Sequence, residues 1–275
     1  MGSPPPMDGD LTWIGTATVL LRLGDATLLT DPNFLHRGEH ARLGWGLRSR
    51  RLTEPTMRIG DLPPLDAVVL SHHHDDHFDA VAARELDPST WILSTDHAVR
   101  KLRRQGFERA QALETWEAAE ISRGDHVVRI TSMPGKHAPS VLVPLVIPPV
   151  MGSMIDFEVG GVRRLRLYVS GDTLVHDDLR EIPRRFPDVD AALLHLGGTR
   201  VAGIVLTMDG RQGVEAIRIV RPRTTMPIHH GDYGIFRDPV STFFAAVRRA
   251  GLDGGVRPIE RGERVTLPLR ATDAA

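Results

Sequence analysis

Short apolar runs bounded by polar turns alternate with helical patterns along most of the chain. Leu11–Leu23 and Ala26–Thr30 are predicted to form two strands joined at a Gly-Asp turn. Leu65–Ser71 is a short continuous apolar run, which is typical of a strand buried on both faces. Further strands are predicted at Trp91–Thr95, His126–Pro134, Arg164–Ser170, Ala191–Gly197, Thr224–His230 and Arg264–Leu269, and helices at Phe78–Leu86, Asp96–Gln105, Gly210–Val220 and Pro239–Ala250.

Strands and helices occur in both halves of the chain, and no Ser/Gly-rich linker divides it. We therefore expect one domain over residues 11–270, built of sheets covered by helices, after a flexible lead-in at residues 1–10. Phe34–Pro64 has little periodicity and is predicted to be a long loop with room for one short helix. The apolar stretch Val141–Met154 is interrupted by three prolines, so it is too short and too broken to span a bilayer.

Composition narrows the classes of function. The chain has no cysteine, which excludes disulfides, thiolate metal sites and a cysteine nucleophile. Its formal net charge of -1 gives no global reason to expect a nucleic-acid or membrane partner, although a local basic patch stays open. The N-terminus has no basic region followed by an apolar stretch, so we expect no secretory signal and a cytoplasmic protein.

The densest chemistry lies in "LSHHHDDHFD", Leu70–Asp79, directly after an apolar run. Because side chains alternate in an extended segment, His72 and His74 should point to one side and His73 to the other. Asp76 and His77 follow where the chain turns into a helix. A solvated polar loop gains nothing from this crowding, whereas a metal site requires it. Imidazole nitrogens with a few carboxylates suit Zn²⁺, Mn²⁺ or Fe²⁺ better than Ca²⁺ or Mg²⁺.

H-x-H-x-D-H after an apolar strand resembles the metallo-β-lactamase superfamily. "TWIGTATVLL", "LLTDPNF", "SGDT" and "PIHHGDYGIF" are similar to the branch that includes N-acyl-phosphatidylethanolamine phospholipase D and the ascorbate-lactone hydrolases. The resemblance implies an α/β fold, an αββα four-layer sandwich, with two divalent transition-metal ions, zinc foremost and manganese or iron as alternatives. It also implies a ligand set: His72, His74 and His137 for one ion, Asp76, His77 and His229 for the other, and Asp172 bridging both together with a hydroxide.

Several assignments have rivals. His126 competes with His137, but only His137 ends a strand. His230 competes with His229, and alternation lets only one of them point inward. Asp76 and His195 are the candidates for catalytic residues, although His195 fits a packed or ligand-supporting role equally well.

Other polar residues carry weaker expectations. The arginines of one loop, Arg37, Arg42, Arg48, Arg50 and Arg51, either form a solvated face, the slightly favoured interpretation, or capture a phosphate or carboxylate. Asp209 and Asp232 are expected to cap helices or to orient ligand histidines. The chain also departs from many relatives at three positions, Thr16, His195 and His230, and these departures bear on the substrate.

The resemblance implies hydrolysis by a metal-bridging hydroxide. No G-x-S-x-G motif is present, and members with a cysteine ligand tend to be true β-lactamases, so a phosphodiester or lactone in a small-molecule or lipid-like substrate is favoured. A nuclease and a non-catalytic metal-binding scaffold are the alternatives, and a homo-oligomer stays open. Val141–Met154 follows the proposed ligand His137, so this apolar run is expected either to line a pocket for a greasy part of the substrate or to complete the core or an interface.

Overall fold

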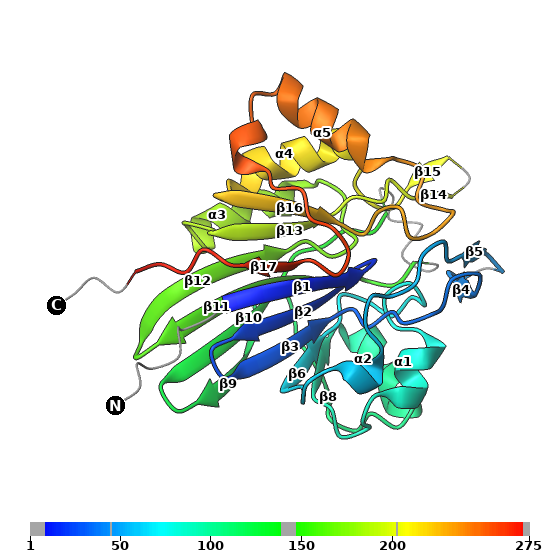
Figure 1. Ribbon diagram of the computed structural model, residues 1–275, viewed down its shortest axis with the longest axis horizontal. Helices are drawn as coiled ribbons and strands as arrows, with labels where there is room; N and C mark the ends of the chain where they lie inside the picture. The colour runs from blue at the N-terminus through cyan, green and yellow to red at the C-terminus, as the bar shows by residue number, and fades with distance from the viewer. Residues whose placement is uncertain (1–8, 45, 139–146, 202, 272–275) are drawn as a thin grey trace.

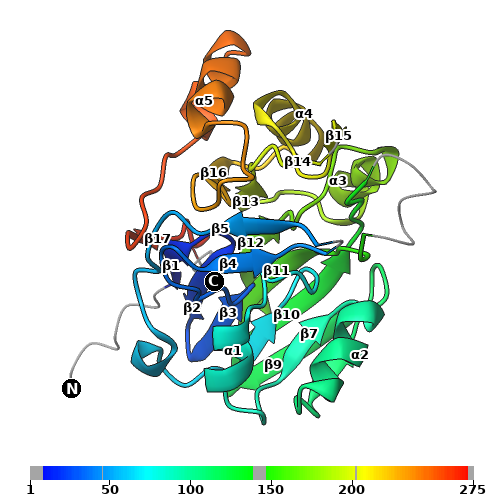
Figure 2. The ribbon, with the colours of Figure 1, turned by 90° about the vertical axis from the view of Figure 1, so that its right-hand side faces the viewer.

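The computed structural model describes residues 9–44, 46–138, 147–201 and 203–271 of the 275-residue chain. Two β-sheets lie face to face in the middle of the molecule, and helices cover the outer face of each (Figure 1, Figure 2). The layers therefore follow the order helix, sheet, sheet, helix, and the αββα sandwich expected from the sequence is confirmed.

The first sheet has seven strands and changes from antiparallel to parallel pairing in its middle. Pairing is antiparallel among β17, β1, β2 and β3 and parallel from β3 through β6 and β7 to β8. The order across the sheet is β17 (Arg264–Thr266), β1 (Gly9–Gly15), β2 (Thr18–Leu23), β3 (Ala26–Thr30), β6 (Ala67–Val69), β7 (Ile92–Ser94) and β8 (Ala110–Ala112).

The second sheet has six strands and makes the same change. Strands β9 to β12 pair antiparallel, whereas β12, β13 and β16 pair parallel. The order across the sheet is β16 (Thr224–Ile228), β13 (Ala191–His195), β12 (Val162–Val169), β11 (Gly152–Val159), β10 (His126–Met133) and β9 (Ala118–Arg123).

Helices and short hairpins complete the described chain. α1 and α2 lie against the first sheet, and α3, α4 and α5 against the second (Figure 1). Two small hairpins, β4–β5 and β14–β15, lie on the same side of the molecule (Figure 1). The bounds are α1 (Ala80–Glu85), α2 (Asp96–Arg104), α3 (Ile182–Arg185), α4 (Gly210–Val220), α5 (Val240–Arg249), β4 (His40–Arg42), β5 (Arg48–Arg50), β14 (Arg200–Val201), β15 (Ile204–Val205) and the 3-10 turns η1 (Ile59–Asp61), η2 (Asp177–Glu181) and η3 (Asp253–Gly255).

Apolar side chains form three layers, and neighbouring strand residues enter different ones. Leu21 of β2 and Leu167 of β12 meet between the two sheets. Their chain neighbours point the other way: Leu20 packs under α1 and α2, and Tyr168 packs under α4 and α5. Because both faces of each sheet are covered, the central strands need apolar residues at consecutive positions, which explains their continuous apolar runs.

Helix starts follow local capping chemistry. The Asp209 carboxylate accepts hydrogen bonds from the backbone N–H groups of Arg211 and Gln212 and so begins α4, whose predicted bounds Gly210–Val220 are confirmed. Asp79 does the same for α1, where it accepts from Val81 and Ala82. Among the residues described, no helix combines the length and the apolar character needed to cross a bilayer.

The prediction of one strand over Leu11–Leu23 is wrong. The run is two strands, β1 and β2, which fold back on each other at Thr16 and Ala17. Thr16 takes a left-handed backbone conformation, with φ of 50°, although a β-branched residue rarely adopts it. Tertiary contacts hold this turn, because the Thr16 N–H donates to Asp232 and its carbonyl accepts from the Trp13 indole.

Other boundaries also differ from the sequence expectation. Gly9 and Asp10 already belong to β1, so the sheet starts inside the expected lead-in. Phe34–Pro64 contains one short helical turn, η1, as the sequence allowed, and also the β4–β5 hairpin, which was not predicted. The edge strands β8 and β9 and the central strand β11 were not predicted. Of the apolar run Val141–Met154, residues 141–146 lie outside the described part, and its end enters β11.

A buried ion pair joins β11 to β12 and gives a stability prediction. Arg166 donates to both oxygens of Asp156, at 2.7 and 2.9 Å. Asp156→Ala would leave the buried guanidinium without its carboxylate, so we expect the free energy of unfolding in urea to fall by about 3–5 kcal/mol. The control is Glu120→Ala, which breaks the exposed Arg129–Glu120 pair and should cost about 1 kcal/mol or less. Equal losses would contradict this account.

Candidate metal centre

The carboxyl ends of four strands meet at one edge of the sandwich, and each carries a predicted ligand. β6 leads into His72, β10 into His137, β12 into Asp172 and β16 into His229. Strands β12 and β16 run in one direction through β13, and β10 shares this direction because two antiparallel steps separate it from β12. The fold therefore brings residues from distant parts of the sequence to one place.

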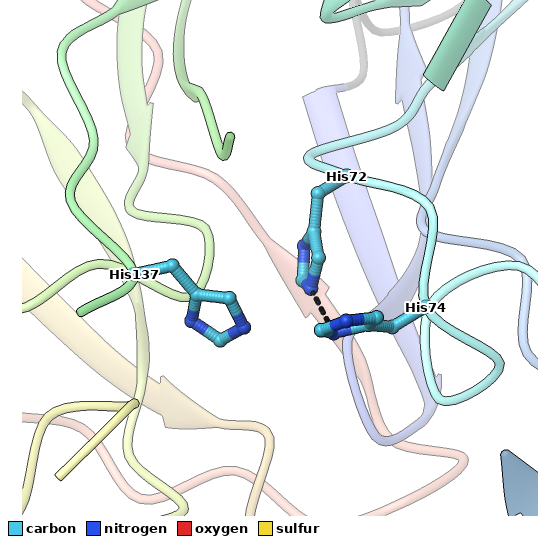
Figure 3. A group of neighbouring side chains, drawn as sticks. All are labelled: His72, His74 and His137. Carbon is cyan, nitrogen blue, oxygen red and sulfur yellow. Dashed lines mark hydrogen bonds between the residues drawn. The ribbon is translucent and has the colours of Figure 1, made fainter. Parts of the chain in front are cut away.

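The first donor group consists of His72, His74 and His137. One ligand atom from each lies within 4.8 Å of those of the other two, and the rings face one another (Figure 3). His72 Nε2 lies 3.0 Å from His74 Nδ1. His73 points elsewhere, toward Gln105 at 3.2 Å, as the alternation of an extended segment requires.

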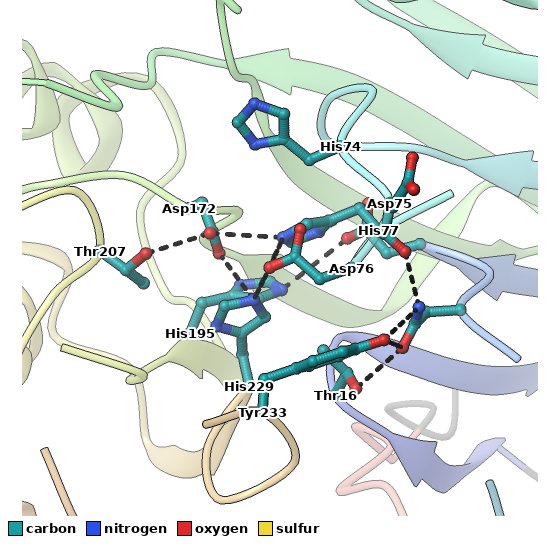
Figure 4. A network of polar contacts seen from close by, with 12 residues as sticks. Thr16, His74, Asp75, Asp76, His77, Asp172, His195, Thr207, His229 and Tyr233 are labelled. Carbon is teal, nitrogen blue, oxygen red and sulfur yellow. Dashed lines mark hydrogen bonds and ion pairs between the residues drawn. The ribbon is translucent and has the colours of Figure 1, made fainter. Parts of the chain in front are cut away.

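The second donor group consists of Asp76, His77, Asp172 and His229, all buried. Asp172 Oδ2 lies 3.3 Å from His77 Nε2, and its Oδ1 lies 3.4 Å from His229 Nε2 (Figure 4). The two imidazole nitrogens themselves are 3.1 Å apart. The groups adjoin, because the rings of His72 and His77 have centroids 4.2 Å apart.

The electrostatics of the two groups differ. Burial holds the pKa of His72 well below its ordinary value and lowers the pKa of His74 to about 3, so both imidazoles stay neutral and free to bind a cation. Burial acts in the same direction on His77, but the carboxylates of Asp172, Asp76 and Asp31 hold its pKa well above the ordinary value. The carboxylates of this group therefore stabilise the charged form of His77.

The donor set fits transition-metal ions. Asp76 Oδ1 and Asp172 Oδ1 are buried and have no hydrogen-bond partner among the described residues. An unpaired buried carboxylate oxygen is costly unless a cation binds it. Five imidazoles with two carboxylates and no thiolate match Zn²⁺, Mn²⁺ or Fe²⁺.

Comparison with known proteins agrees with this geometry. The family model described as "Beta-lactamase superfamily domain" matches residues 27–230, which is most of the chain. The chain belongs to the metallo-β-lactamase superfamily. A UPF0173 metal-dependent hydrolase of Anaeromyxobacter dehalogenans is 29% identical over 93% of this chain and 86% of its own length. The superfamily assignment and the His/Asp donor groups together identify the protein as a metal-dependent hydrolase.

More distant likenesses support the same fold. An N-acyl-phosphatidylethanolamine-hydrolyzing phospholipase D of Caenorhabditis elegans is 27% identical over 81% of this chain, which spans 64% of that protein. The structure of an isothiocyanate hydrolase from Delia radicum gut bacteria superposes with a TM-score of 0.78 at 19% identity, over 93% of this chain and 98% of that one. At such identity the structural match speaks for the metallo-β-lactamase fold alone.

Three residues that the sequence analysis did not single out contact the proposed metal ligands and orient them. Asp31, at the end of β3, lies 3.4 Å from His77 Nδ1 and accepts both the Ser71 hydroxyl and the Ser71 N–H. The Thr207 hydroxyl donates to Asp172. The Leu206 carbonyl lies 2.9 Å from His137 Nδ1, which leaves the other ring nitrogen for the donor group. One sequence signal pointed to Asp31: it directly follows the predicted strand Ala26–Thr30, as the proposed ligands follow strands.

The rival histidines lie outside both groups. His126 sits near the β2–β3 turn, with its ring 3.0 Å from Asp25. His230 packs against Trp13 instead of joining His229, with ring centroids 5.0 Å apart. Burial lowers the pKa of His230 to about 4.

His195 lies beside the second group without belonging to it. Its side chain is fully buried, and its ring centroid is 5.3 Å from that of His229 (Figure 4). Like His77 and His229, it is therefore shielded from solvent.

The predictions for the arginine loop, Asp209 and Asp232 have different outcomes. Arg51 is buried, where it bonds Asn33 and faces the Tyr233 ring, so it is a structural residue. The other four arginines of its loop, Arg37, Arg42, Arg48 and Arg50, are exposed. Asp209 caps α4 as expected. Asp232 contacts no ligand ring and instead binds Arg261 and the Thr16 turn, whose carbonyl accepts the His229 N–H at 2.8 Å.

A cavity of about 520 Å³ is lined by residues that lie close in the chain to the ligands, although no donor residue lines it. Two lining residues connect it to the ligand segments: Gly135 stands two residues before His137, and the Met151 N–H donates to the carbonyl of Ser71, which precedes His72. Carboxylates of α2, η2 and the Glu114 turn contribute to its rim. Its apolar wall consists of Leu113, Trp116, Pro134, Pro149, Val150 and Met151.

Proposed function

We propose that the protein is a binuclear metal-dependent hydrolase that cleaves a phosphodiester or a lactone in a small-molecule or lipid-like substrate. The observation that carries this proposal is the pair of adjoining donor groups, one with three imidazoles and the other with two imidazoles and two carboxylates. His72, His74 and His137 would hold one ion, and Asp76, His77 and His229 the other. Asp172 would bridge them. Zinc suits these ligands best.

Bound divalent ions would supply a hydroxide near neutral pH by lowering the pKa of a shared water, and they would polarise the substrate oxygen. The chain's own residues prepare this chemistry. The buried neutral imidazoles of the first group, His72, His74 and His137, offer lone pairs without first losing a proton. Asp76 and Asp172 balance the cationic charge, and the hydrogen bonds from Thr207 and to Leu206 fix the orientation of Asp172 and His137. Asp76 is the side chain of this set that we assign to the reacting centre.

The cavity supports a substrate with an apolar part. Pro149, Val150 and Met151 come from the end of the apolar run Val141–Met154 and line this cavity. The likeness to an N-acyl-phosphatidylethanolamine-hydrolyzing enzyme points the same way. A nuclease is less favoured, because the net charge of -1 offers no excess of cations for a phosphate backbone.

The test combines metal analysis with a substrate panel. Protein purified without chelator should contain two transition-metal ions per chain and should hydrolyse members of a panel of bis-p-nitrophenyl phosphate, lactones and N-acyl phospholipids. Active protein without zinc, manganese or iron would overturn the proposal. Activity on RNA alone would favour the nuclease alternative.

The apolar wall gives a further prediction. Among substrates of increasing acyl length, kcat/KM should rise by roughly fourfold for each methylene that enters the cavity, since burying one contributes about 0.8 kcal/mol. Trp116→Ala should flatten this dependence. Trp91→Ala is the matched control, because Trp91 is also partly buried but does not line the cavity. A dependence that is absent, or that both variants keep, would remove the cavity from the substrate site.

A further inference from the structure

His195 ends β13 in a position that neither the ligand set nor the core requires. Its imidazole is fully buried, yet its Nε2 has no hydrogen-bond partner among the described residues. Buried polar atoms in native proteins are nearly always paired, so an isolated ring nitrogen needs an explanation. The nearby acceptor is Asp31, whose Oδ2 lies 3.8 Å away.

The other carboxylate oxygen of Asp31, Oδ1, already has hydrogen-bond partners. Oδ1 accepts the Ser71 N–H and the Ser71 hydroxyl, both at 2.8 Å, and faces His77 Nδ1 at 3.4 Å. Its backbone is fixed too, because its N–H donates to Val69 and its carbonyl accepts the Thr18 hydroxyl. Asp31 therefore stands between two imidazoles, His77 on Oδ1 and His195 on Oδ2.

Ser170 decides which nitrogen of His195 carries the proton. Its hydroxyl lies 3.1 Å from His195 Nδ1 and 2.9 Å from the Gly171 carbonyl, and it can donate to only one of them. The Gly171 carbonyl already accepts the Thr173 N–H at 2.8 Å. If the Ser170 hydroxyl donates to Nδ1, the Gly171 carbonyl still has a partner. The ring hydrogen of His195 is then on Nε2, where it faces the Asp31 carboxylate. In the other tautomer, a nitrogen lone pair would face that carboxylate.

We propose that His195 is a positioning residue of the second donor group, which acts through Asp31: Ser170 fixes its Nε2–H tautomer, Nε2–H attracts Asp31 Oδ2 electrostatically across 3.8 Å, and Asp31 Oδ1 orients His77. Side chains that orient metal-bound histidines through a carboxylate contribute about 10–100-fold to metal affinity. The inference rests on the proposed binuclear site but concerns binding of the second ion rather than turnover. It replaces the interpretation of His195 as a residue that contacts substrate.

Two substitutions of His195 by amide side chains distinguish the roles of its two ring nitrogens. The amide nitrogen of glutamine can occupy the place of Nε2, whereas that of asparagine can occupy the place of Nδ1. His195→Gln therefore keeps a donor toward Asp31, and His195→Asn keeps only a group near Ser170. A purely structural role would make the two variants similar.

The experiment titrates metal-free protein with Co²⁺ and with Zn²⁺ against a competing chelator. In His195→Asn the second ion should bind about 10–100-fold more weakly, and the Co²⁺ absorption spectrum of that site should change. In His195→Gln both should stay near wild type. Affinity for the first ion, at His72, His74 and His137, serves as the internal reference. Ser170→Ala, which keeps the imidazole but frees its tautomer, should lie between the two and covers the case in which the asparagine variant does not fold.

The outcomes separate the two proposals. Equal second-ion affinity in the asparagine and glutamine variants would overturn the role of His195 and leave the hydrolase proposal intact. Wild-type protein that binds only one ion would overturn both. The expected asymmetry, together with no hydrolysis of any substrate in the panel, would support His195 and count against the hydrolase.

Discussion

His74→Ala should remove one of the two bound metal ions and abolish hydrolysis. His74 belongs to a group of only three imidazoles, and its ring contacts His72 at 3.0 Å. With His72 and His137 alone, two nitrogens would remain where a four-coordinate site needs three protein ligands and a water. Elemental analysis after gel filtration measures the metal content, and the substrate panel measures the activity.

The matched control is the preceding residue in the chain. His73→Ala removes an imidazole from the same motif, but that imidazole points toward Gln105 and away from both donor groups. We expect its metal content to match wild type and its kcat/KM to fall by less than about tenfold, as for a residue outside the ligand shell. If His73→Ala lost the ion and His74→Ala kept it, the assignment of faces along the motif would be wrong.

The candidate site was largely readable from the sequence because its main signal is local. Strict alternation after a buried strand separates His72 and His74 from His73 without any knowledge of the rest of the fold. The later candidates, His137, Asp172 and His229, came from the resemblance to the metallo-β-lactamase superfamily, and the structure places each of them after the end of a strand. Asp31 could not be ranked in the same way, because a turn aspartate before proline is common and its contact with His77 spans 46 positions of sequence.

The bounds of secondary-structure elements were predicted correctly where the hydrophobic periodicity and the capping residues indicate the same ends. Gly210–Val220 has an aspartate cap before it and an apolar face throughout, so its bounds were predicted correctly. Leu11–Leu23 was not, since strand-forming residues continue on both sides of the turn, and what bends the chain at Thr16 is Asp232, 216 positions away. β8 and β9 are edge strands with alanine, glutamine and glutamate, residues that carry little strand signal of their own.

Asp172→Asn should reduce kcat/KM by more than about hundredfold, beyond the 10–100-fold expected for residues that only orient ligands. Asp172 is the one carboxylate that lies within 3.4 Å of both His77 Nε2 and His229 Nε2. The nearby imidazoles of His229 and His77 hold its pKa well below the ordinary value, although burial acts in the opposite direction. The carboxylate is therefore ionised whether or not a metal is present, and an amide of the same shape removes that charge alone.

Two variants isolate the role of this charge. Thr207→Val removes the hydrogen bond to Asp172 Oδ2 but keeps the carboxylate, and His195→Ala leaves Asp172 untouched. Both should reduce kcat/KM by no more than about 10–100-fold. Metal titration of Asp172→Asn should show weaker binding of both ions, because a bridging carboxylate neutralises both cations at once. If only the second ion binds more weakly, Asp172 is a ligand of one site, as its place beside Asp76, His77 and His229 alone would suggest. If Asp172→Asn and His195→Ala have equally mild effects, the bridge lies elsewhere.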